Sequence, residues 1–271
     1  MKLAGRVAVI TGAGSGLGRE IALAFTREGA RVAINDIRHT AAEAVVQEMA
    51  RAGGDGLALP ADVSDSIEVR AMFEQIVDAW GTVDILVNNA GFVTITEDVK
   101  RELHQVCAEI QRAGHSTRSV GATRGMLDSQ WRRTLSVHLD GTFYCTREAL
   151  KIMEPKGSGR IVNVASVAGI TGLLGAPDYS AAKAGIIGLT KAVAREVIGC
   201  GIHVNAVAPG FVDTPLLEGL DESMRQSILQ QTPIGRLGTP HEVAAAVLYL
   251  ASDDASYTVG QVLSPNGGYC I

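Results

Sequence analysis

Three side chains in the second half of the chain have the types and spacing that proton transfer needs. Tyr179 and Lys183 stand four residues apart, and Ser166 lies thirteen residues before Tyr179, at the end of an apolar strand. A phenol and an ammonium at i and i+4 share one face of a helix, so the amine can influence the ionisation of the phenol. A lysine cation about 4 Å away favours the phenolate by about 4 kcal/mol at an effective dielectric constant of about 20. The spacing predicts Tyr179 as acid/base with its pKa lowered by Lys183, and Ser166 as the group that holds a substrate oxygen.

A glycine-rich turn near the N-terminus, residues 11–18, complements these groups. The glycines follow the spacing G-x-x-x-G-x-G, which differs from the G-x-G-x-x-G dinucleotide fingerprint. The physical logic is the same: the first glycine permits the turn, the second lets a phosphate approach the backbone, and the third packs the helix on the strand. The turn therefore predicts a dinucleotide site, with a ligand-free glycine corner as the simpler alternative. The candidate cofactor-binding residues here are Gly12, Ser15, Gly16, Leu17 and Gly18.

Asp36 indicates which dinucleotide binds. It ends the second predicted strand, about 20 residues after the turn, where an acid can bond the ribose 2′-hydroxyl. Its charge would repel a 2′-phosphate, which favours NAD over NADP. Arg38 is the counter-argument, because a guanidinium nearby could accept that phosphate. An acid at a strand end can also simply form a turn or cap a helix.

Composition excludes several other classes of protein. The chain has 271 residues, of which 46% are hydrophobic, and its net charge of -5 provides no basic stripe for nucleic acid. Cys107, Cys145, Cys200 and Cys270 lack metal-ligand spacing, so we expect no metal site and reduced thiols. The apolar run Val7–Ile10 is too short for a signal peptide or a membrane span. We expect a cytoplasmic protein without a membrane partner.

Apolar runs and helical periods alternate along the whole chain. Expected strands are Val7–Ile10, Arg31–Ile37, Leu57–Ala61, Ile85–Asn88, Arg160–Ala165, Ile202–Ala208 and Gln261–Leu263. Expected helices are Leu17–Arg27, Thr40–Arg51, Ile67–Trp80, about Gln130–Met153, Asp178–Val197 and Pro240–Ser252. This alternation predicts an α/β fold with a doubly wound parallel sheet. No linker or repeat divides residues 1–271, so one domain is expected.

The motifs, taken together and in order, resemble the short-chain dehydrogenase/reductase family. The matching segments cover nearly the whole chain: the glycine turn, Asp62-Val63, Asn88 to Gly91, Ser166, Tyr179 to Lys183, Pro209-Gly210 and Thr214. The resemblance implies a Rossmann-type seven-stranded parallel sheet, a homodimer or homotetramer, and further cofactor contacts. By resemblance, Asp62 and Val63 hold the adenine, Asn89, Ala90 and Gly91 line the cofactor, Pro209 and Gly210 border it, Tyr179 and Lys183 contact the nicotinamide ribose, and Val212 and Thr214 fix the carboxamide.

His138 is the first departure from the family pattern. It stands where the family has an asparagine that is thought to kink a helix and to hold a water linked to the lysine. Histidine can also bind a water and titrates near neutrality, so it could replace the asparagine in a proton relay. Alternatively the ring only fills space while the main-chain carbonyl keeps the role.

An extra segment at about residues 94–125 is the second departure. Val99, Leu103, Val106 and Ile110 are spaced as on an amphipathic helix, and residues 114–125 form a polar, glycine-flanked loop. Because the segment follows a central strand, it should lie at the rim of the binding crevice. It is either a lid or pocket wall, or a surface or oligomer contact.

The substrate is the least determined feature. Leucines and other apolar residues follow Ser166 and Gly210, which favours an apolar secondary alcohol or ketone; they are Leu173, Leu174, Phe211, Leu216, Leu217, Leu220 and Met224. An NAD-dependent alcohol dehydrogenase or ketone reductase is the leading hypothesis. The alternatives are a lyase or epimerase that uses bound nucleotide, and a non-catalytic NAD-binding regulator. Intact Ser166, Tyr179 and Lys183 argue against the regulator.

Overall fold

One parallel sheet of seven strands forms the centre of the molecule. The computed structural model describes residues 1–217 and 222–271, without the side chains of Gln111 and Ser223. The strand order is β3-β2-β1-β4-β5-β6-β7. The strands are β1 (Val7–Ile10), β2 (Arg31–Asp36), β3 (Gly56–Pro60), β4 (Ile85–Asn88), β5 (Gly159–Val164), β6 (Ile202–Val207) and β7 (Val262–Leu263). The predicted strands and the doubly wound fold class are confirmed, each strand end to within about one residue.

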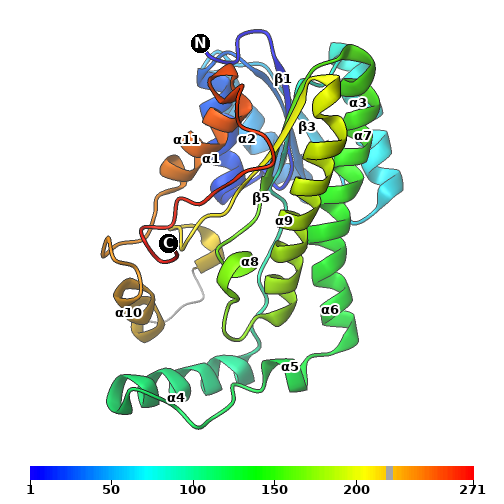
Figure 1. Cartoon of the computed structure of the whole chain (residues 1–271). Coiled ribbons are helices and arrows are strands. Elements are labelled where there is room, and N and C mark those ends of the chain that lie inside the picture. Colours follow the sequence, from blue (N-terminus) through cyan, green and yellow to red (C-terminus); the bar gives the residue numbers. More distant parts are fainter. Residues whose placement is uncertain (218–221) are drawn as a thin grey trace.

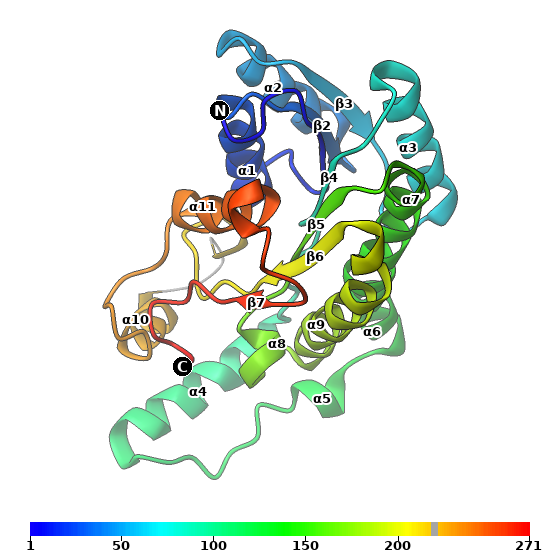
Figure 2. The same ribbon diagram turned by 45° about the horizontal axis from the view of Figure 1, so that its top comes forward.

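Helices cover both faces of the sheet (Figures 1 and 2). On one face lie α1 (Gly16–Arg27), α2 (His39–Arg51) and α11 (Pro240–Ala251), and on the other α3 (Ser66–Trp80), α7 (Gly141–Lys156) and α9 (Pro177–Val197). Successive residues of β1 pack against opposite layers of helices. Ala8 and Ile10 face the layer of α1, α2 and α11, and Val7 and Val9 face the layer of α3, α7 and α9. A strand covered on both faces is apolar throughout, which is why the short runs could be recognised in the sequence.

The helix predicted at about Gln130–Met153 is present, but it is not α-helical throughout. The structure has α6 (Asp128–Leu135), a π-helical turn at Ser136–Asp140, and then α7. A π turn lengthens the hydrogen-bonded ring by one residue and often marks a functional site. Here it carries His138.

The extra segment forms the predicted amphipathic helix, α4 (Glu97–Ala113), which lies beside α10 (Glu222–Gln230) at the end of the molecule that Figure 1 draws lowest. Thr96 caps its start, and Gly114 ends it with a φ of 77°. The loop then folds back along the helix, where Arg118 bonds Glu109 at 2.7 Å and Gln105 at 2.7 Å. The predicted loop to residue 125 is wrong at its end, because α5 (Ala122–Gly125) forms a short helical turn there.

A few short elements were not predicted. They are α8 (Ala168–Thr171), α10, and 3₁₀ turns at Ile198–Cys200, Pro215–Leu217 and Asp253–Ala255. Leu220, expected beside the substrate, lies outside the described residues. Within the described ranges, no helix combines the length and apolarity that crossing a bilayer requires.

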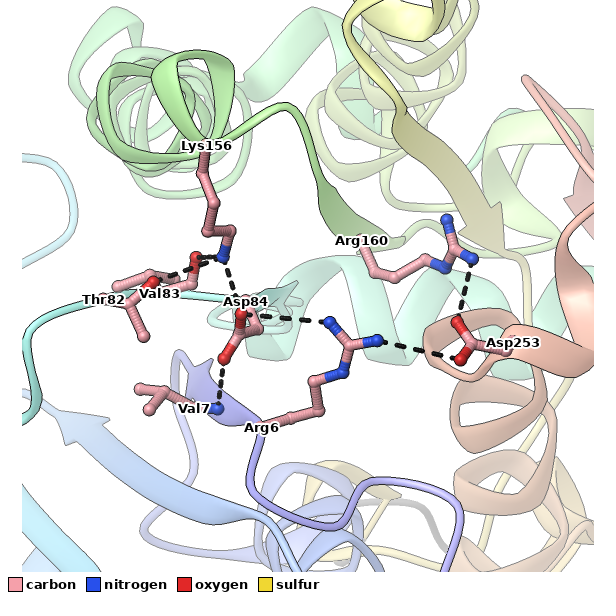
Figure 3. A network of polar contacts seen from close by, with 8 residues as sticks. All are labelled: Arg6, Val7, Thr82, Val83, Asp84, Lys156, Arg160 and Asp253. Atoms are coloured by element: carbon pink, nitrogen blue, oxygen red, sulfur yellow. Dashed lines mark hydrogen bonds and ion pairs between the residues drawn. The ribbon is translucent and has the colours of Figure 1, made fainter.

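A polar network ties the amino ends of the strands together (Figure 3). Asp84, just before β4, accepts hydrogen bonds from the Val7 main chain at 2.8 Å and from Lys156 Nζ at 2.6 Å. Arg6 lies 4.0 Å from Asp84 and 3.7 Å from Asp253, which follows α11. The cavity lined by the predicted site residues lies at the opposite, carboxyl edge of the sheet.

Candidate active site

A cavity of about 580 Å³ opens beyond the carboxyl ends of β1, β4, β5 and β6. Its volume lies in the range of about 300–1,000 Å³ typical of small-molecule sites. Most predicted site residues line it: Gly12, Ser15, Gly16, Leu17, Gly18, Asn89, Gly91, His138, Ser166, Tyr179, Lys183, Pro209, Gly210, Val212 and Thr214. Residues predicted from opposite ends of the chain therefore meet in one place.

Four predicted residues lie outside the cavity wall: Asp36, Asp62, Val63 and Ala90. Ala90 packs behind the glycine turn, since a Cβ on Gly12 would lie 2.7 Å from the Ala90 Cα. Val63 is buried and packs close to Gly141 of α7. Burial raises the pKa of Asp62, but hydrogen bonds from Ser64 and Arg133 outweigh it, so the net pKa is lowered.

The glycine turn is fastened to the loop after β4. Asn89 Nδ2 donates to the main-chain oxygens of Thr11 at 2.9 Å and Gly12 at 3.1 Å. Gly12 has a φ of 61°, which favours glycine, and a Cβ on Gly18 would lie 2.5 Å from the Gly12 oxygen. Any side chain at residue 18 would therefore push the turn away from α1.

Asp36 supports the same turn from the side of β2. Its Oδ2 accepts a hydrogen bond from the Gly14 N–H at 3.0 Å, and its Oδ1 accepts one from the Arg38 N–H at 3.0 Å. Arg38 Nε also lies 3.5 Å from Oδ1. Each carboxylate oxygen keeps a second lone pair for another donor, such as a ribose hydroxyl.

Ser166, Tyr179 and Lys183 come together as their spacing predicts. Pro177 opens α9, Tyr179 lies in its first turn, and Lys183 lies one turn later. Lys183 Nζ is 5.6 Å from the centre of the Tyr179 ring and donates a hydrogen bond to the Val164 carbonyl at 2.6 Å. The Ser166 hydroxyl accepts the Ala168 N–H at 3.1 Å and lies near enough to Tyr179 to influence its pKa.

Burial dominates the electrostatics of this group. It raises the pKa of Tyr179 above the ordinary value of 10.0, although the hydrogen bond with Ser166 opposes the shift. Burial also lowers the pKa of Lys183 from 10.5 to about 7. The pKa of Tyr179 is thus raised in this structure, contrary to the predicted lowering by Lys183, because burial disfavours the phenolate.

His138 is buried between the phenol and the loop after β4. Its Nε2 lies 3.0 Å from the main-chain nitrogen of Phe92 and 2.8 Å from the Phe92 oxygen. Its ring meets the Tyr179 ring edge-on at 5.3 Å. Burial, assisted by the Lys183 charge, lowers the pKa of His138 to about 3. The His138 carbonyl accepts a hydrogen bond from Thr142 Oγ1 at 2.6 Å.

Sequence reasoning missed several residues of the cavity wall, among them Phe92, Cys107, Ile228, Gln231 and Tyr269. Ile228 follows Met224 by four residues on α10, a spacing that could have indicated it. Tyr269 gave no signal, because it comes from the far end of the chain and is placed by its edge-on contact with Phe211 at 5.4 Å. In the described part of the chain, no three His, Cys, Asp or Glu side chains are grouped to hold a metal ion.

Comparison with known sequences finds relatives over the full length. The model of the family described as enoyl-(acyl carrier protein) reductase matches residues 12–270. The 3-oxoacyl-[acyl-carrier-protein] reductase FabG of Thermotoga maritima is 40% identical over 271 residues, covering 100% of both chains. The BbsD subunit of (2S)-[(R)-hydroxy(phenyl)methyl]succinyl-CoA dehydrogenase from Thauera aromatica is 40% identical over 268 residues, covering 99% of this chain and 98% of the relative.

Solved structures agree with these relatives. A short-chain type dehydrogenase/reductase from Mycobacterium marinum superposes with a TM-score of 0.86 at 32% identity, covering 99% of this chain and 96% of the other. A candidate NAD(P)-dependent gluconate 5-dehydrogenase from Beutenbergia cavernae, with NADP bound at low occupancy, gives a TM-score of 0.86 at 36% identity. The match covers 99% of this chain and 98% of the B. cavernae chain.

The lowered pKa of Lys183 predicts a pH-dependent effect on stability. An amine whose pKa falls from 10.5 to about 7 on folding destabilises the folded state most below about pH 7, where it is charged in both the folded and the unfolded state. This destabilisation fades as pH rises toward 10.5. Lys183→Met should therefore stabilise the protein by about 2–5 kcal/mol near pH 6, at about 1.36 kcal/mol per pKa unit, less the lost bond to Val164. The gain should shrink toward about pH 10.

Thermal melts without added cofactor, at about pH 6 and about pH 10, would measure this difference. Lys191→Met, which changes an exposed lysine on the same helix, is the matched control and should show no such trend. An equal gain for Lys183→Met at both pH values would contradict the prediction.

Proposed function

The chain belongs to the short-chain dehydrogenase/reductase family of oxidoreductases, and from this premise we propose that it transfers hydride between NAD and an apolar secondary alcohol or ketone. One observation carries the proposal. Ser166, Tyr179 and Lys183 line the same cavity as the glycine turn of residues 12–18. Proton-transfer groups thus stand within one cavity with a phosphate-binding backbone.

The glycine turn fits a dinucleotide. It leads into the N-terminus of α1, where main-chain N–H groups and the helix dipole favour a pyrophosphate. Gly16 has a φ of 53°, and a Cβ there would meet nothing closer than Pro215 Cδ at 3.5 Å, so the backbone is open to a ligand. When bound, a nicotinamide cofactor supplies the carrier for hydride, and the protein supplies its orientation and the proton.

Tyr179 moves the proton. With its pKa raised by burial, its phenol is protonated at neutral pH and can donate to a ketone oxygen as hydride reaches the carbon. In the reverse direction, the phenolate must accept the alcohol proton, and a protonated Lys183 then favours that phenolate. Ser166 can hydrogen-bond the same substrate oxygen and hold it against the phenol.

The remaining wall of the cavity is largely apolar. Leu103, Leu174, Phe211, Met224 and Ile228 contribute to it from four separate segments. The T. aromatica relative is described by a substrate with a phenyl group. Both observations support a substrate whose non-reacting part is apolar. An NAD-binding regulator would not need the proton-transfer residues. A lyase or epimerase that uses bound nucleotide would use them without net oxidation of its substrate.

Asp36 supports NAD rather than NADP. It is buried, bonded to the turn through Gly14, and keeps acceptor capacity for ribose hydroxyls. Arg38 is exposed and lies near Asp36, where its guanidinium could accept a 2′-phosphate, so it favours NADP. The B. cavernae structure with NADP supports that alternative too.

The segment of residues 94–125 is proposed as a wall of the substrate cavity. Leu103 and Cys107 of α4 line the cavity, and Leu103 packs against Gly175, where a Cβ would lie 2.9 Å from Leu103 Cδ1. Ile110, at the other end of the apolar stripe, is 44% exposed. The exposed end supports the assembly role that the sequence left open. A cytoplasmic homodimer or homotetramer remains part of the proposal.

Tyr179→Phe should lower kcat by at least about 100-fold while cofactor affinity stays near wild type, because it removes only the ionisable oxygen. The measurement is the absorbance of reduced nicotinamide with a panel of apolar secondary alcohols and ketones, beside a cofactor titration by fluorescence. Near-normal turnover by Tyr179→Phe would refute the assigned acid/base. Product formation by the wild type without net reduction or oxidation of the cofactor would favour the lyase or epimerase.

Asp36→Asn should weaken NAD binding by about 10- to 150-fold, the equivalent of one charge-assisted hydrogen bond worth about 1.5–3 kcal/mol, and should relax discrimination against NADP. Asparagine keeps an acceptor for the Gly14 N–H, so the turn is spared. Arg38→Ala is the matched comparison and should leave NAD binding near wild type. A wild-type enzyme that prefers NADP and loses it in Arg38→Ala would overturn the NAD assignment.

Replacing residues 94–125 by a short Gly/Ser link should raise KM or lower kcat/KM while NAD titration stays near wild type, since the segment borders substrate rather than cofactor. Light scattering measures the oligomer in parallel. Ile110→Lys is the control variant, because it charges the exposed end of the stripe without altering the cavity wall. Unchanged kinetics together with a dissociated oligomer would identify the segment as an assembly element.

A further inference from the structure

The His138 imidazole is enclosed by three segments of the chain. It projects from the π turn, its Nε2 contacts both main-chain polar atoms of Phe92 at 3.0 and 2.8 Å, and its ring meets Tyr179 edge-on. The Phe92 ring adds a tilted contact at 5.4 Å. Only 1% of His138 is exposed. The ring therefore joins the loop after β4 to the first turn of α9.

Gly91 completes the fit. A Cβ on Gly91 would lie 2.3 Å from His138 Cε1 and 2.7 Å from Nδ1, closer than real contacts allow. The imidazole can occupy its place only because residue 91 has no side chain. The ring therefore packs directly against the backbone of Gly91.

The contacts of Nε2 argue against proton transfer through the ring. Both main-chain polar atoms of Phe92 lie within hydrogen-bond distance of Nε2, at 3.0 and 2.8 Å, so this nitrogen is held by the main chain. A relay needs a donor on one nitrogen and an acceptor on the other, so a nitrogen held by the main chain interrupts it. The lowered pKa agrees, because burial, assisted by the Lys183 charge, keeps the ring neutral.

We propose that His138 is a positioning residue, whose imidazole fastens Gly91 and Phe92, in the loop after β4, against Tyr179 and so sets the orientation of the phenol. The inference rests on the proposed function only in giving Tyr179 the proton-transfer role. A misplaced phenol loses turnover before it loses affinity, since orientation acts on the reacting geometry.

Two variants separate positioning from proton relay. The side-chain amide of glutamine reaches the position of Nε2, whereas leucine fills similar space without a polar group. His138→Gln should keep the bond to Phe92 and hold kcat within about threefold of wild type, while His138→Leu should lose that bond and about tenfold in kcat. The pH profile of kcat should keep its shape and apparent pKa in both variants. Circular dichroism and cofactor titration establish that each variant is folded.

Two results would overturn the proposal. A kcat for His138→Leu equal to that of His138→Gln would show that the bond to Phe92 does not position Tyr179, and an apparent pKa displaced in either variant would make the ring part of proton transfer. A second measurement needs no turnover. In ¹⁵N-histidine NMR of the whole protein, His138 should remain one neutral tautomer from about pH 5 to pH 9 and should change its signal in Gly91→Ala. A His138 signal that titrates in that range would refute the proposal. If the wild type turned over no alcohol or ketone, the proposed function would fail. The NMR measurement would still test whether His138 is a neutral ring held against Gly91.

Discussion

Parallel pairing of β1 with β4, and of β4 with β5, fixes where the central parts of the site lie relative to one another. In parallel strands the carboxyl ends share one edge, so the glycine turn, Asn89 and Ser166 emerge side by side. Asn89 then bonds the glycine turn directly, which converts neighbouring strand ends into one rigid rim. A slip of one residue in this pairing would exchange the faces of each strand and unpack both layers of helices, so the site and the core depend on the same register.

The helices that complete the core also set the charge states of the site. α9 holds Tyr179 and Lys183 where water is excluded, and exclusion of water favours the neutral form of both groups. Burial brings the pKa of Lys183 down to about 7, so a charge that a ligand brings beside the amine would act on its protonation.

The features that could be read from the sequence are those set by local pattern. β1 and β4 were located to the residue because strands buried on both faces are short apolar runs, and Tyr179 and Lys183 were paired because helical spacing alone places them on one face. The π turn at Ser136–Asp140 was missed because it shifts hydrogen bonds by one residue without disturbing the apolar pattern. The direction of the Tyr179 pKa shift was missed because it depends on how deeply the side chain is buried. Burial comes from tertiary packing, which the sequence does not show.

The α4 segment has an apolar cluster that lies apart from the two layers of the core. Arg118 fastens its loop to the helix, and Val120 packs with Leu103 and Val106, joined by Met224 of α10. Such a segment can be exchanged as a block, in natural divergence or in a designed library, provided that its contact with α10 is kept. The part of the cavity wall that α4 supplies is encoded in a different stretch of the gene from Ser166, Tyr179 and Lys183, so this wall can change while those three residues stay the same.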